Sequence, residues 1–447
     1  MGPKLLIERA SWTLVDQGVV SFGNFLLTVL LARTLSEADY GKFVLFLGVV
    51  FVGRVFDYSL ISYPLSVRLC VADDEERAGL LGNTILLTAI LSLVLVVAVA
   101  LGTTLLGVDN IRLPACLCFL CWQAQETSRR CLLADFRYRA AVAGDGTAYV
   151  GQAVLIVLLS WLGGITLPSA LYMMSATFAI GALVHASKLR FAWPDFSEAR
   201  ILAREFLSVG KWSLVNYQLV IFRGQLFPWV LAGVAGTAAT ASLQAGANIA
   251  GTMTPIILGI GNAIPQVAAQ AHRTAGVIGA ARAAYGYVLF GLAPVLAICA
   301  AAVLIPELLL RTVYGPSSPY VAVAMGLQIL AVAGVLDYIA DAANKMLLGV
   351  EAGRLASLVN LVAVAAAAVM AFALIGRLGV IGACVGLLVA NLVRATGAVL
   401  AIAWLINNEK SREPALSGAA ATPAGIEEVV GGPAEQAIAM NGRLEND

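Results

Sequence analysis

The chain has 447 residues, of which 60% are hydrophobic and only 12% are charged, and its formal net charge is +1. A soluble domain carries about 25% charged residues, so this composition excludes a water-soluble globular protein and indicates an integral membrane protein. The near-balanced charge argues against a nucleic-acid partner. The first apolar stretch is too long and too polar for a cleavable signal peptide, so none is expected.

Twelve apolar stretches have the length of about 20 residues that crosses a bilayer. We therefore predict an all-α integral membrane protein with about twelve transmembrane helices. The first six are expected near 12–33, 42–62, 82–106, 113–133, 146–164 and 168–187, and the next six near 210–233, 238–262, 284–305, 320–342, 356–376 and 380–406. The first, fourth, seventh and tenth carry several polar residues, which is typical of spans that line a protein interior or a wet cavity.

The basic residues are distributed unequally between the two sides of these spans. If the N-terminus is cytoplasmic, most of the 28 Lys and Arg residues fall in cytoplasmic segments. The turns on the outer side then contain only Arg33, Lys42, Arg112, Arg311 and Arg377. This bias follows the positive-inside rule, so we predict that both termini are cytoplasmic.

The longest connection between spans divides them into two sets of six. We predict an N-terminal six-helix bundle over 1–187, a cytoplasmic linker over 188–209 and a C-terminal six-helix bundle over 210–406. The linker is expected to form an interfacial helix, with these residues on one apolar face: Phe196, Ile201, Leu202, Phe206 and Leu207. Residues 407–447 are rich in Ala, Gly, Pro and Glu, which predicts a disordered cytoplasmic tail.

The two sets of spans have similar sequence features at corresponding positions. Similar Gly-rich turns recur in the same topological positions, at an offset of about 200 residues. This pattern favours two pseudo-symmetric halves and indicates a transporter whose site lies at their interface.

Seven cysteines are present, and four of them lie between 116 and 131. The chain has only two histidines, His185 and His272, and neither is near this group in the sequence. A cysteine in an apolar helix usually packs as a small hydrophobe, so we expect neither a metal site nor a cofactor.

Arginines inside the predicted spans are the strongest functional signal. A charge at membrane depth costs about 2.5–3.5 kcal/mol, and an arginine cannot shed its proton. Arg54, Arg223 and Arg394 lie in three different spans, and Asp57 lies three residues after Arg54 on the same helix face. Guanidinium groups that face one cavity would bind a phosphate or carboxylate. We predict that the three arginines bind substrate and that Asp57 pairs with Arg54.

Other polar residues in the spans leave two interpretations open. The amides Gln123, Asn216 and Asn391 either contact substrate or join helices to one another. Asp16 is a lone carboxylate that would carry a coupling proton unless it pairs with Arg54. Asp337 and Asp341 either serve as ion-coupling or charge-pairing groups or form an exposed ladder with Lys345, and the spacing favours the ladder.

The sequence contains no catalytic constellation. Its outer connections are short turns, and no nucleotide-binding motif is present. We therefore predict that the chain is not an enzyme and does not drive transport with ATP.

Several segments resemble a known family. The stretch LLARTLSEADYGKFVLF is similar to the first hairpin of the polysaccharide transporter family, the Wzx-type O-antigen and exopolysaccharide flippases. The second-half stretch GRLGVIGACVGLLVANLV is similar as well, and the resemblance covers roughly residues 5–406. It implies two six-helix bundles in a V, as in the multidrug exporters of the same superfamily, around a cationic cavity.

The resemblance also implies a function. Such a protein flips an undecaprenyl-diphosphate-linked oligosaccharide from the cytoplasmic to the outer leaflet of the bacterial inner membrane, by ion- or potential-coupled alternating access. Its expected partners are this lipid, the surrounding membrane lipid, and a polysaccharide polymerase and co-polymerase. Arg54 would then meet the diphosphate.

Two alternatives remain. The sister multidrug antiporters share the fold and would use Asp16 for proton or sodium coupling. A membrane component of polysaccharide synthesis or assembly is the other, although the chain lacks a catalytic loop. The lipid II flippase branch has two further spans for which this chain has no room, which disfavours a role in peptidoglycan synthesis.

Overall fold

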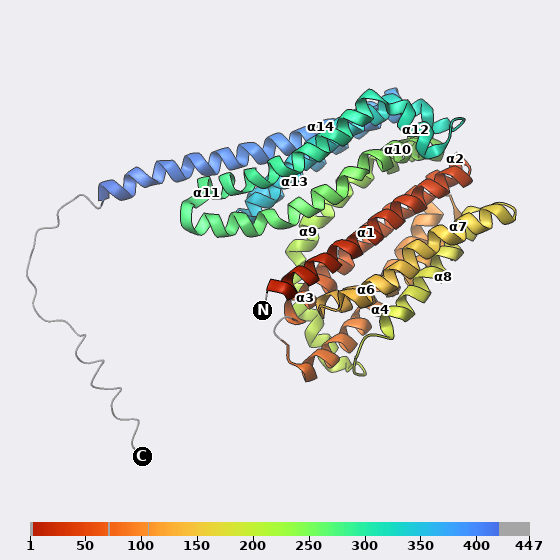
Figure 1. Ribbon diagram of the computed structural model, residues 1–447, viewed down its shortest axis with the longest axis horizontal. Helices are drawn as coiled ribbons and strands as arrows, with labels where there is room; N and C mark the ends of the chain where they lie inside the picture. Colours follow the sequence, from red (N-terminus) through yellow and green to blue (C-terminus); the bar gives the residue numbers. More distant parts are fainter. Residues whose placement is uncertain (1–2, 70–71, 106, 420–447) are drawn as a thin grey trace, which may run out of the picture. The chain divides into compact units, whose positions relative to one another are not determined.

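The computed structural model describes residues 3–69, 72–105 and 107–419, and the regular structure in these ranges is helical without strands (Figure 1). The first half contains α1 (Pro3–Thr34), α2 (Glu37–Asp57), η1 (Tyr58–Ser62), α3 (Tyr63–Leu69), α4 (Asp74–Leu105), η2 (Asp109–Ile111), α5 (Arg112–Ala134), α6 (Tyr138–Asp145), η3 (Gly146–Val150), α7 (Gly151–Leu162) and α8 (Leu167–Ala186). The second half contains α9 (Phe196–Ala235), α10 (Thr237–Ala250), η4 (Gly251–Met253), α11 (Thr254–Leu304), α12 (Pro306–Tyr314), η5 (Pro319–Val323), α13 (Ala324–Gly349) and α14 (Gly353–Ala419).

These helices make up the predicted set of spans. In the described part of the chain, nine stretches are long and apolar enough to cross a membrane. Two of them each contain two helices joined at a bend, which lies at Ala275–Gly276 in α11 and at Gly379 in α14. Both glycines have a positive φ, a conformation that residues with a side chain rarely adopt. The charged helix α5 also has the length of a span, and its inclusion gives the expected total of about twelve.

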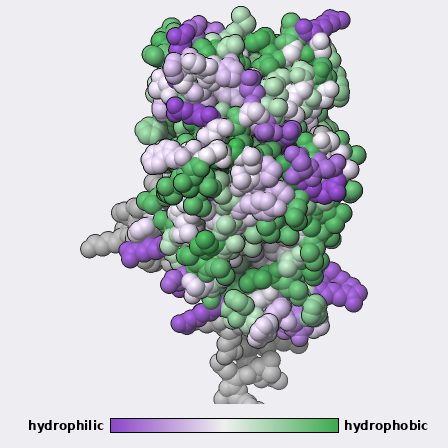
Figure 2. Space-filling model, turned by 90° about the vertical axis from the view of Figure 1, so that its right-hand side faces the viewer, coloured by the Kyte–Doolittle hydropathy of each residue, from purple (hydrophilic) through white to green (hydrophobic). Residues whose placement is uncertain are grey.

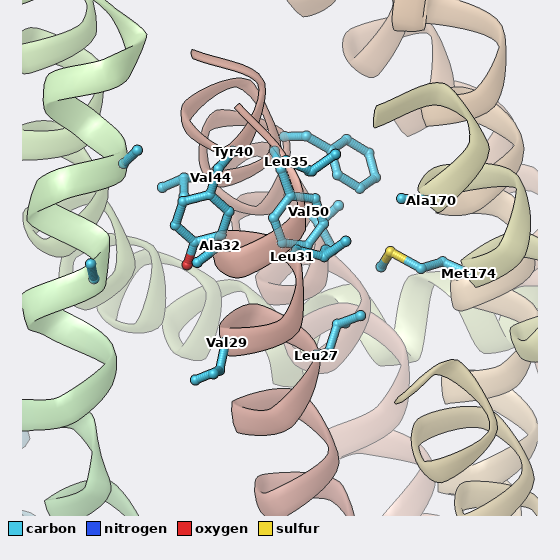
Figure 3. Packing of buried hydrophobic residues seen from close by; sticks show 14 of the residues in the cluster. Leu27, Val29, Leu31, Ala32, Leu35, Tyr40, Val44, Val50, Ala170 and Met174 are labelled. Atoms are coloured by element: carbon cyan, nitrogen blue, oxygen red, sulfur yellow. The ribbon is translucent and has the colours of Figure 1, made fainter. Parts of the chain in front are cut away.

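Most helices pack on helices of their own half, whereas α2 and α9 also pack extensively on the other half (Figure 1). In the first half, α5 packs between α4 and α8, and α1 packs on α6 and α7. Figure 3 shows apolar side chains of α1 and α2, such as Leu27 and Val50, close to Met174 of α8. In the second half, α11 packs on α13, and α9 shares a core with α14. Buried cysteines such as Cys118 and Cys384 belong to these cores, as expected for small hydrophobes.

The two halves contact each other along α9, which packs on α2, η1, α3 and α4, and at the end of the bundles that we predict to face outward. The backbone of α2 at Gly41 lies so close to the carbonyl of Thr237 on α10 that no side chain would fit there. The Asn248 amide donates hydrogen bonds to the hydroxyls of Tyr40 (3.0 Å) and Tyr314 (3.2 Å), and so joins α10 to α2 and α12. Figure 2 looks onto this end and shows hydrophilic residues interspersed with hydrophobic ones. These contacts tie the halves together at this end.

The linker differs from its prediction. Phe196–Ala235 forms one continuous helix, α9, so the expected interfacial helix and the seventh span are a single element. Leu202 and Phe206 are buried against α3 and α4, whereas Phe196, Ile201 and Leu207 are exposed. The expected single apolar face is wrong, because 3.6 residues per turn places these five residues on different sides of the helix.

The chain divides into two compact units, and the first of them ends at Ile402 and includes both halves. The second begins at Ala403, within α14. Because α14 continues to Ala419, residues 407–419 are helical where we predicted disorder. An existing helix extends at little cost through residues such as Glu409 and Lys410, which favour helices. The rest of the predicted tail, 420–447, lies outside the described residues.

Candidate functional site

Charged side chains gather in two clusters, one in each half. The N-terminal charge cluster consists of Asp16, Arg54, Glu126, Arg129, Arg130 and Asp145. The C-terminal charge cluster consists of Arg223, Asp337, Asp341, Lys345 and Arg394. The structure therefore does not bring Arg54 together with the other two predicted arginines.

Arg129 of α5 is the centre of the N-terminal charge cluster. Its guanidinium donates to Asp16 on α1, and its Nε lies 2.5 Å from Asp145 Oδ2 on α6. Its Nη1 lies 3.4 Å from Glu126 Oε2, one turn earlier on α5. All four side chains are buried, so each buried carboxylate has the cationic partner that burial demands. Asp16 is thus neither a lone carboxylate nor a partner of Arg54.

Glu126 links this buried centre to two more exposed arginines. Its Oε1 accepts a hydrogen bond from Arg130 Nε at 2.8 Å and lies 3.7 Å from Arg54 Nη2. The Arg54 side chain is 44% exposed and the Glu126 side chain only 4%. The accessible side of the N-terminal charge cluster therefore presents guanidinium groups.

The predicted ion pair between Arg54 and Asp57 is wrong. Asp57 is buried and accepts a hydrogen bond from the Ser62 hydroxyl at 3.0 Å, and its Oδ1 has no hydrogen-bond partner among the described residues. The π-helical turn Tyr58–Ser62, which directly follows Asp57, brings Ser62 within reach. Arg54 instead extends toward Glu126 on the neighbouring helix α5.

Asp337 of α13 is the centre of the C-terminal charge cluster. Its Oδ1 alone accepts hydrogen bonds from Arg223 Nη2 on α9 (3.0 Å) and Arg394 Nη1 on α14 (3.1 Å). Arg394 Nη2 also lies 3.7 Å from Asp341 Oδ1, and Lys345 Nζ lies 3.4 Å from Asp341 Oδ2. The expected exposed ladder is wrong for Asp337, because this carboxylate points to two arginines of other helices.

Buried amides hold the two arginines of this cluster. Arg223 donates to Asn391 Oδ1, and Arg394 Nε donates to Asn360 Oδ1 at 3.0 Å. The amide of Asn391 in turn donates to the Ala333 carbonyl at 2.9 Å, and that of Asn360 donates to Asn216 Oδ1 at 3.1 Å. The structure thus brings six predicted residues together: Asn216, Arg223, Asp337, Asp341, Asn391 and Arg394.

Sequence reasoning missed much of the N-terminal charge cluster. Arg129 and Arg130 lie near the end of a predicted span and were assigned to the cytoplasmic side, and Asp145 precedes its predicted span by one residue. The spacing of Glu126 to Arg129 and Arg130, at i+3 and i+4, was the available signal. Gln123 was predicted, but it belongs to neither cluster. It is buried, and neither polar atom of its side chain has a partner in the described part of the chain.

Arg54 and Arg223 lie at similar levels of two adjacent helices. Helices α2 and α9 run side by side, because Gly48 lies against Gln225 and the Tyr58 ring lies 5.2 Å from the Tyr217 ring. These two contacts bracket Arg54 on α2 and Arg223 on α9. Arg54 and Arg223 therefore both lie between the same two contacts of this helix pair.

Comparison with known proteins identifies the fold. No protein-family model and no curated protein sequence matches the chain. An inward-facing multidrug resistance MATE family transporter of the MOP superfamily has a TM-score of 0.73 at 16% identity, covering 92% of this chain and 99% of its own. The lipid II flippase MurJ, in an inward closed conformation, has a TM-score of 0.72 at 12% identity, covering 89% and 87%.

An outward-facing MATE family transporter of the same superfamily gives a TM-score of 0.61 at 17% identity, covering 91% of this chain and 97% of its own. The chain therefore has the all-helical fold that MATE transporters and MurJ share. Its helices are arranged more like those of the inward-facing structure than those of the outward-facing one.

Proposed function

We propose that this chain is a flippase that carries an undecaprenyl-diphosphate-linked oligosaccharide from the cytoplasmic to the outer leaflet of a bacterial inner membrane. The fold supports a transporter, because its structural neighbours include MATE transporters and a lipid II flippase. The contacts of α10 with α2 and α12 at the outer end and the likeness to an inward-facing structure support loading from the cytoplasmic side. A polysaccharide polymerase and co-polymerase would take up the product.

The observation that supports this proposal most strongly is that Arg54 is exposed and lacks a close carboxylate partner. It lies inside a membrane span, its side chain is 44% exposed, and its nearest carboxylate oxygen is 3.7 Å away, which is longer than a hydrogen bond. Its guanidinium fork can therefore bind a phosphate through two parallel hydrogen bonds. Arg130, one-quarter exposed, adds a second cationic group on the same side of Glu126. A cationic drug would be repelled here.

The carboxylates of both clusters remain candidates for ion coupling or charge pairing. Asp16 is held by Arg129 in a buried ion pair. Asp57 has an unpartnered oxygen within the described residues. Coupling at Asp16 would act within the N-terminal charge cluster, and coupling at Asp57 would act beside it, three residues after Arg54.

One observation favours a second function, a multidrug antiporter. The most exposed group of the C-terminal charge cluster is a carboxylate, because Asp337 is 33% exposed, whereas Asp341 and Lys345 are 21% and 22% exposed. Carboxylates at membrane depth would attract a cationic drug. A third class, a membrane component of polysaccharide synthesis, would bind the lipid diphosphate without carrying it across the bilayer.

These functions can be separated with purified protein in lipid nanodiscs and vesicles. We expect binding of farnesyl diphosphate, a short polyprenyl diphosphate, and no competition by the cationic dye ethidium. Vesicles that contain the protein should also move a fluorescent polyprenyl diphosphate between leaflets, which a synthesis component would not do. Binding of ethidium without binding of farnesyl diphosphate would favour the antiporter.

The key variant is Arg54→Ala, which should weaken farnesyl diphosphate binding roughly 10- to 100-fold, because a charged hydrogen bond contributes about 1.5–3 kcal/mol. Arg54→Lys should restore part of the affinity, since it keeps the charge but not the fork. Arg311→Ala is the matched control, because Arg311 is also exposed and also faces a glutamate, at 3.4 Å rather than 3.7 Å, at the outer end of the molecule. Equal affinities for wild type and Arg54→Ala would contradict the proposal.

A further inference from the structure

The two arginines of the C-terminal charge cluster lie behind their counter-ion. The side chains of Arg223 and Arg394 are only 9% and 4% exposed, whereas that of Asp337 is 33% exposed. An anion that approaches from the accessible side therefore meets Asp337 first. It can reach the two guanidinium groups only if this carboxylate moves aside.

Both arginines have hydrogen-bond partners other than Asp337. Asn391 binds one guanidinium and Asn360 the other, and both amides are anchored to further protein groups. Asn391 and Asn360 lie on α14, and the groups that they bind lie on α13 and α9, so three helices hold the arginines in place. The arginine pair would thus stay in place when the Asp337 side chain rotates away.

The charges in this cluster do not balance. It contains three cationic groups, Arg223, Arg394 and Lys345, and two carboxylates, so its net charge is +1. One oxygen of Asp337 serves both arginines, and Asp341 is divided between Arg394 and Lys345. A site lined by an excess of positive charge attracts a further anion.

From this arrangement we infer that Asp337 is a displaceable internal counter-ion, which occupies in the empty protein the place that a phosphate of the substrate takes when bound. This inference rests on the proposed function and adds Arg223 and Arg394 to its phosphate-binding groups. A phosphate offers more acceptor oxygens than a carboxylate, so it can accept from each guanidinium separately. Asp337 then competes with substrate, which lowers affinity and favours release.

The test measures the binding of inorganic pyrophosphate to the full chain in nanodiscs at low salt. Asp337→Asn keeps the shape of the side chain and removes the competing charge, so we expect it to bind pyrophosphate at least about tenfold more tightly than wild type. The control variant is Glu307→Gln, which makes the same chemical change in an exposed ion pair with Arg311 and should leave the affinity unchanged. A purely structural role for Asp337 predicts the opposite sign, a loss of affinity.

Thermal unfolding provides a second readout if the variant is unstable. Asp337→Asn should unfold at a lower temperature than wild type without ligand and regain the difference when pyrophosphate is added. The double variant Asp337→Asn with Arg223→Gln should lose the tight binding, because it removes one of the two guanidinium groups.

Each result decides between the two claims. If wild type binds pyrophosphate and Asp337→Asn binds it no more tightly, or if pyrophosphate fails to restore the stability of the variant, the counter-ion inference is overturned. If neither protein binds pyrophosphate and wild type does not bind farnesyl diphosphate, the proposed function itself fails. If wild type binds farnesyl diphosphate through Arg54 alone, the proposed function stands without the inference.

Discussion

The charge clusters of the two halves have opposite arrangements of similar side chains. In the first half the buried centre is a cation, Arg129, which contacts three carboxylates, and the more exposed groups are Arg54 and Arg130. In the second half the centre is an anion, Asp337, which contacts two buried arginines and is itself partly exposed. The fourth span of each half carries its centre. A repeated fold thus presents arginines from one half and carboxylates from the other.

The difference teaches that pseudo-symmetry of helices does not extend to their charges. The N-terminal charge cluster contains three cationic and three anionic groups, so its charges balance. The C-terminal charge cluster has one cation in excess. A cluster whose charges balance can hold its helices together, whereas a cluster with excess positive charge can bind an anion. Charge substitutions should therefore destabilise the first cluster more than the second.

The largest expected effect is that of Arg129→Gln. This change leaves Asp16 and Asp145 buried without their cationic partner, and breaking a buried ion pair in this way costs about 3–5 kcal/mol. We expect little monodisperse protein after purification and a strongly lowered unfolding temperature. Arg130→Gln is the matched control, because Arg130 is more exposed, pairs with Glu126 at its Nε and otherwise lies over the Tyr58 ring. If Arg129→Gln were as stable as Arg130→Gln, the balanced cluster would not be structural.

A smaller effect is expected for Arg394→Gln. Asp337 keeps Arg223 as its partner and is partly exposed to water, so no carboxylate is stranded in the interior. We expect a loss of about 1–3 kcal/mol, the cost of lost charged hydrogen bonds, seen as a moderate shift in thermal unfolding. A loss of stability as large as that of Arg129→Gln would show that the two clusters have the same structural role, and would contradict the distinction between them.

The smallest effect is expected for Lys345→Gln. Lys345 and Asp341 are both partly exposed and lie 3.4 Å apart at i,i+4 on α13. Such pairs contribute about 0.3–0.5 kcal/mol, so the unfolding temperature should stay within the error of the measurement. Pyrophosphate binding should weaken slightly, because the excess charge is removed. An unchanged affinity would show that only the two arginines create the attraction.

Much of the fold could be predicted because each span is a long apolar run. The bends at Gly276 and Gly379 separate helices that the sequence had already divided into two spans. The continuity of α9 through the linker could not be predicted in the same way. Burial of Leu202 and Phe206 against other helices, rather than against lipid, decides that arrangement.

The two clusters differ in how far the sequence could predict them. Arg223 and Arg394 lie well inside their spans. The free energy needed to place a charged side chain in lipid makes such residues rare, so the sequence alone identifies them as candidates. Arg129 lies near a span end, where an arginine ordinarily reaches water. Its partner Asp16 is 113 residues away in the sequence. No local pattern connects such residues, so only packing shows which ones share a site.

The charges of α5 also bear on how the protein enters the membrane. Three charged residues, Glu126, Arg129 and Arg130, make this helix a poor candidate to leave the translocation channel alone, because charged side chains within a span are costly to place in lipid. Its counter-charges come from Asp16, which is synthesised before it, and from Asp145 on α6, which follows only 16 residues after Arg129. We therefore expect α5 to wait for α6 and to insert with it as a hairpin beside α1. The ion pairs of the folded protein would then set the order in which its helices enter the lipid.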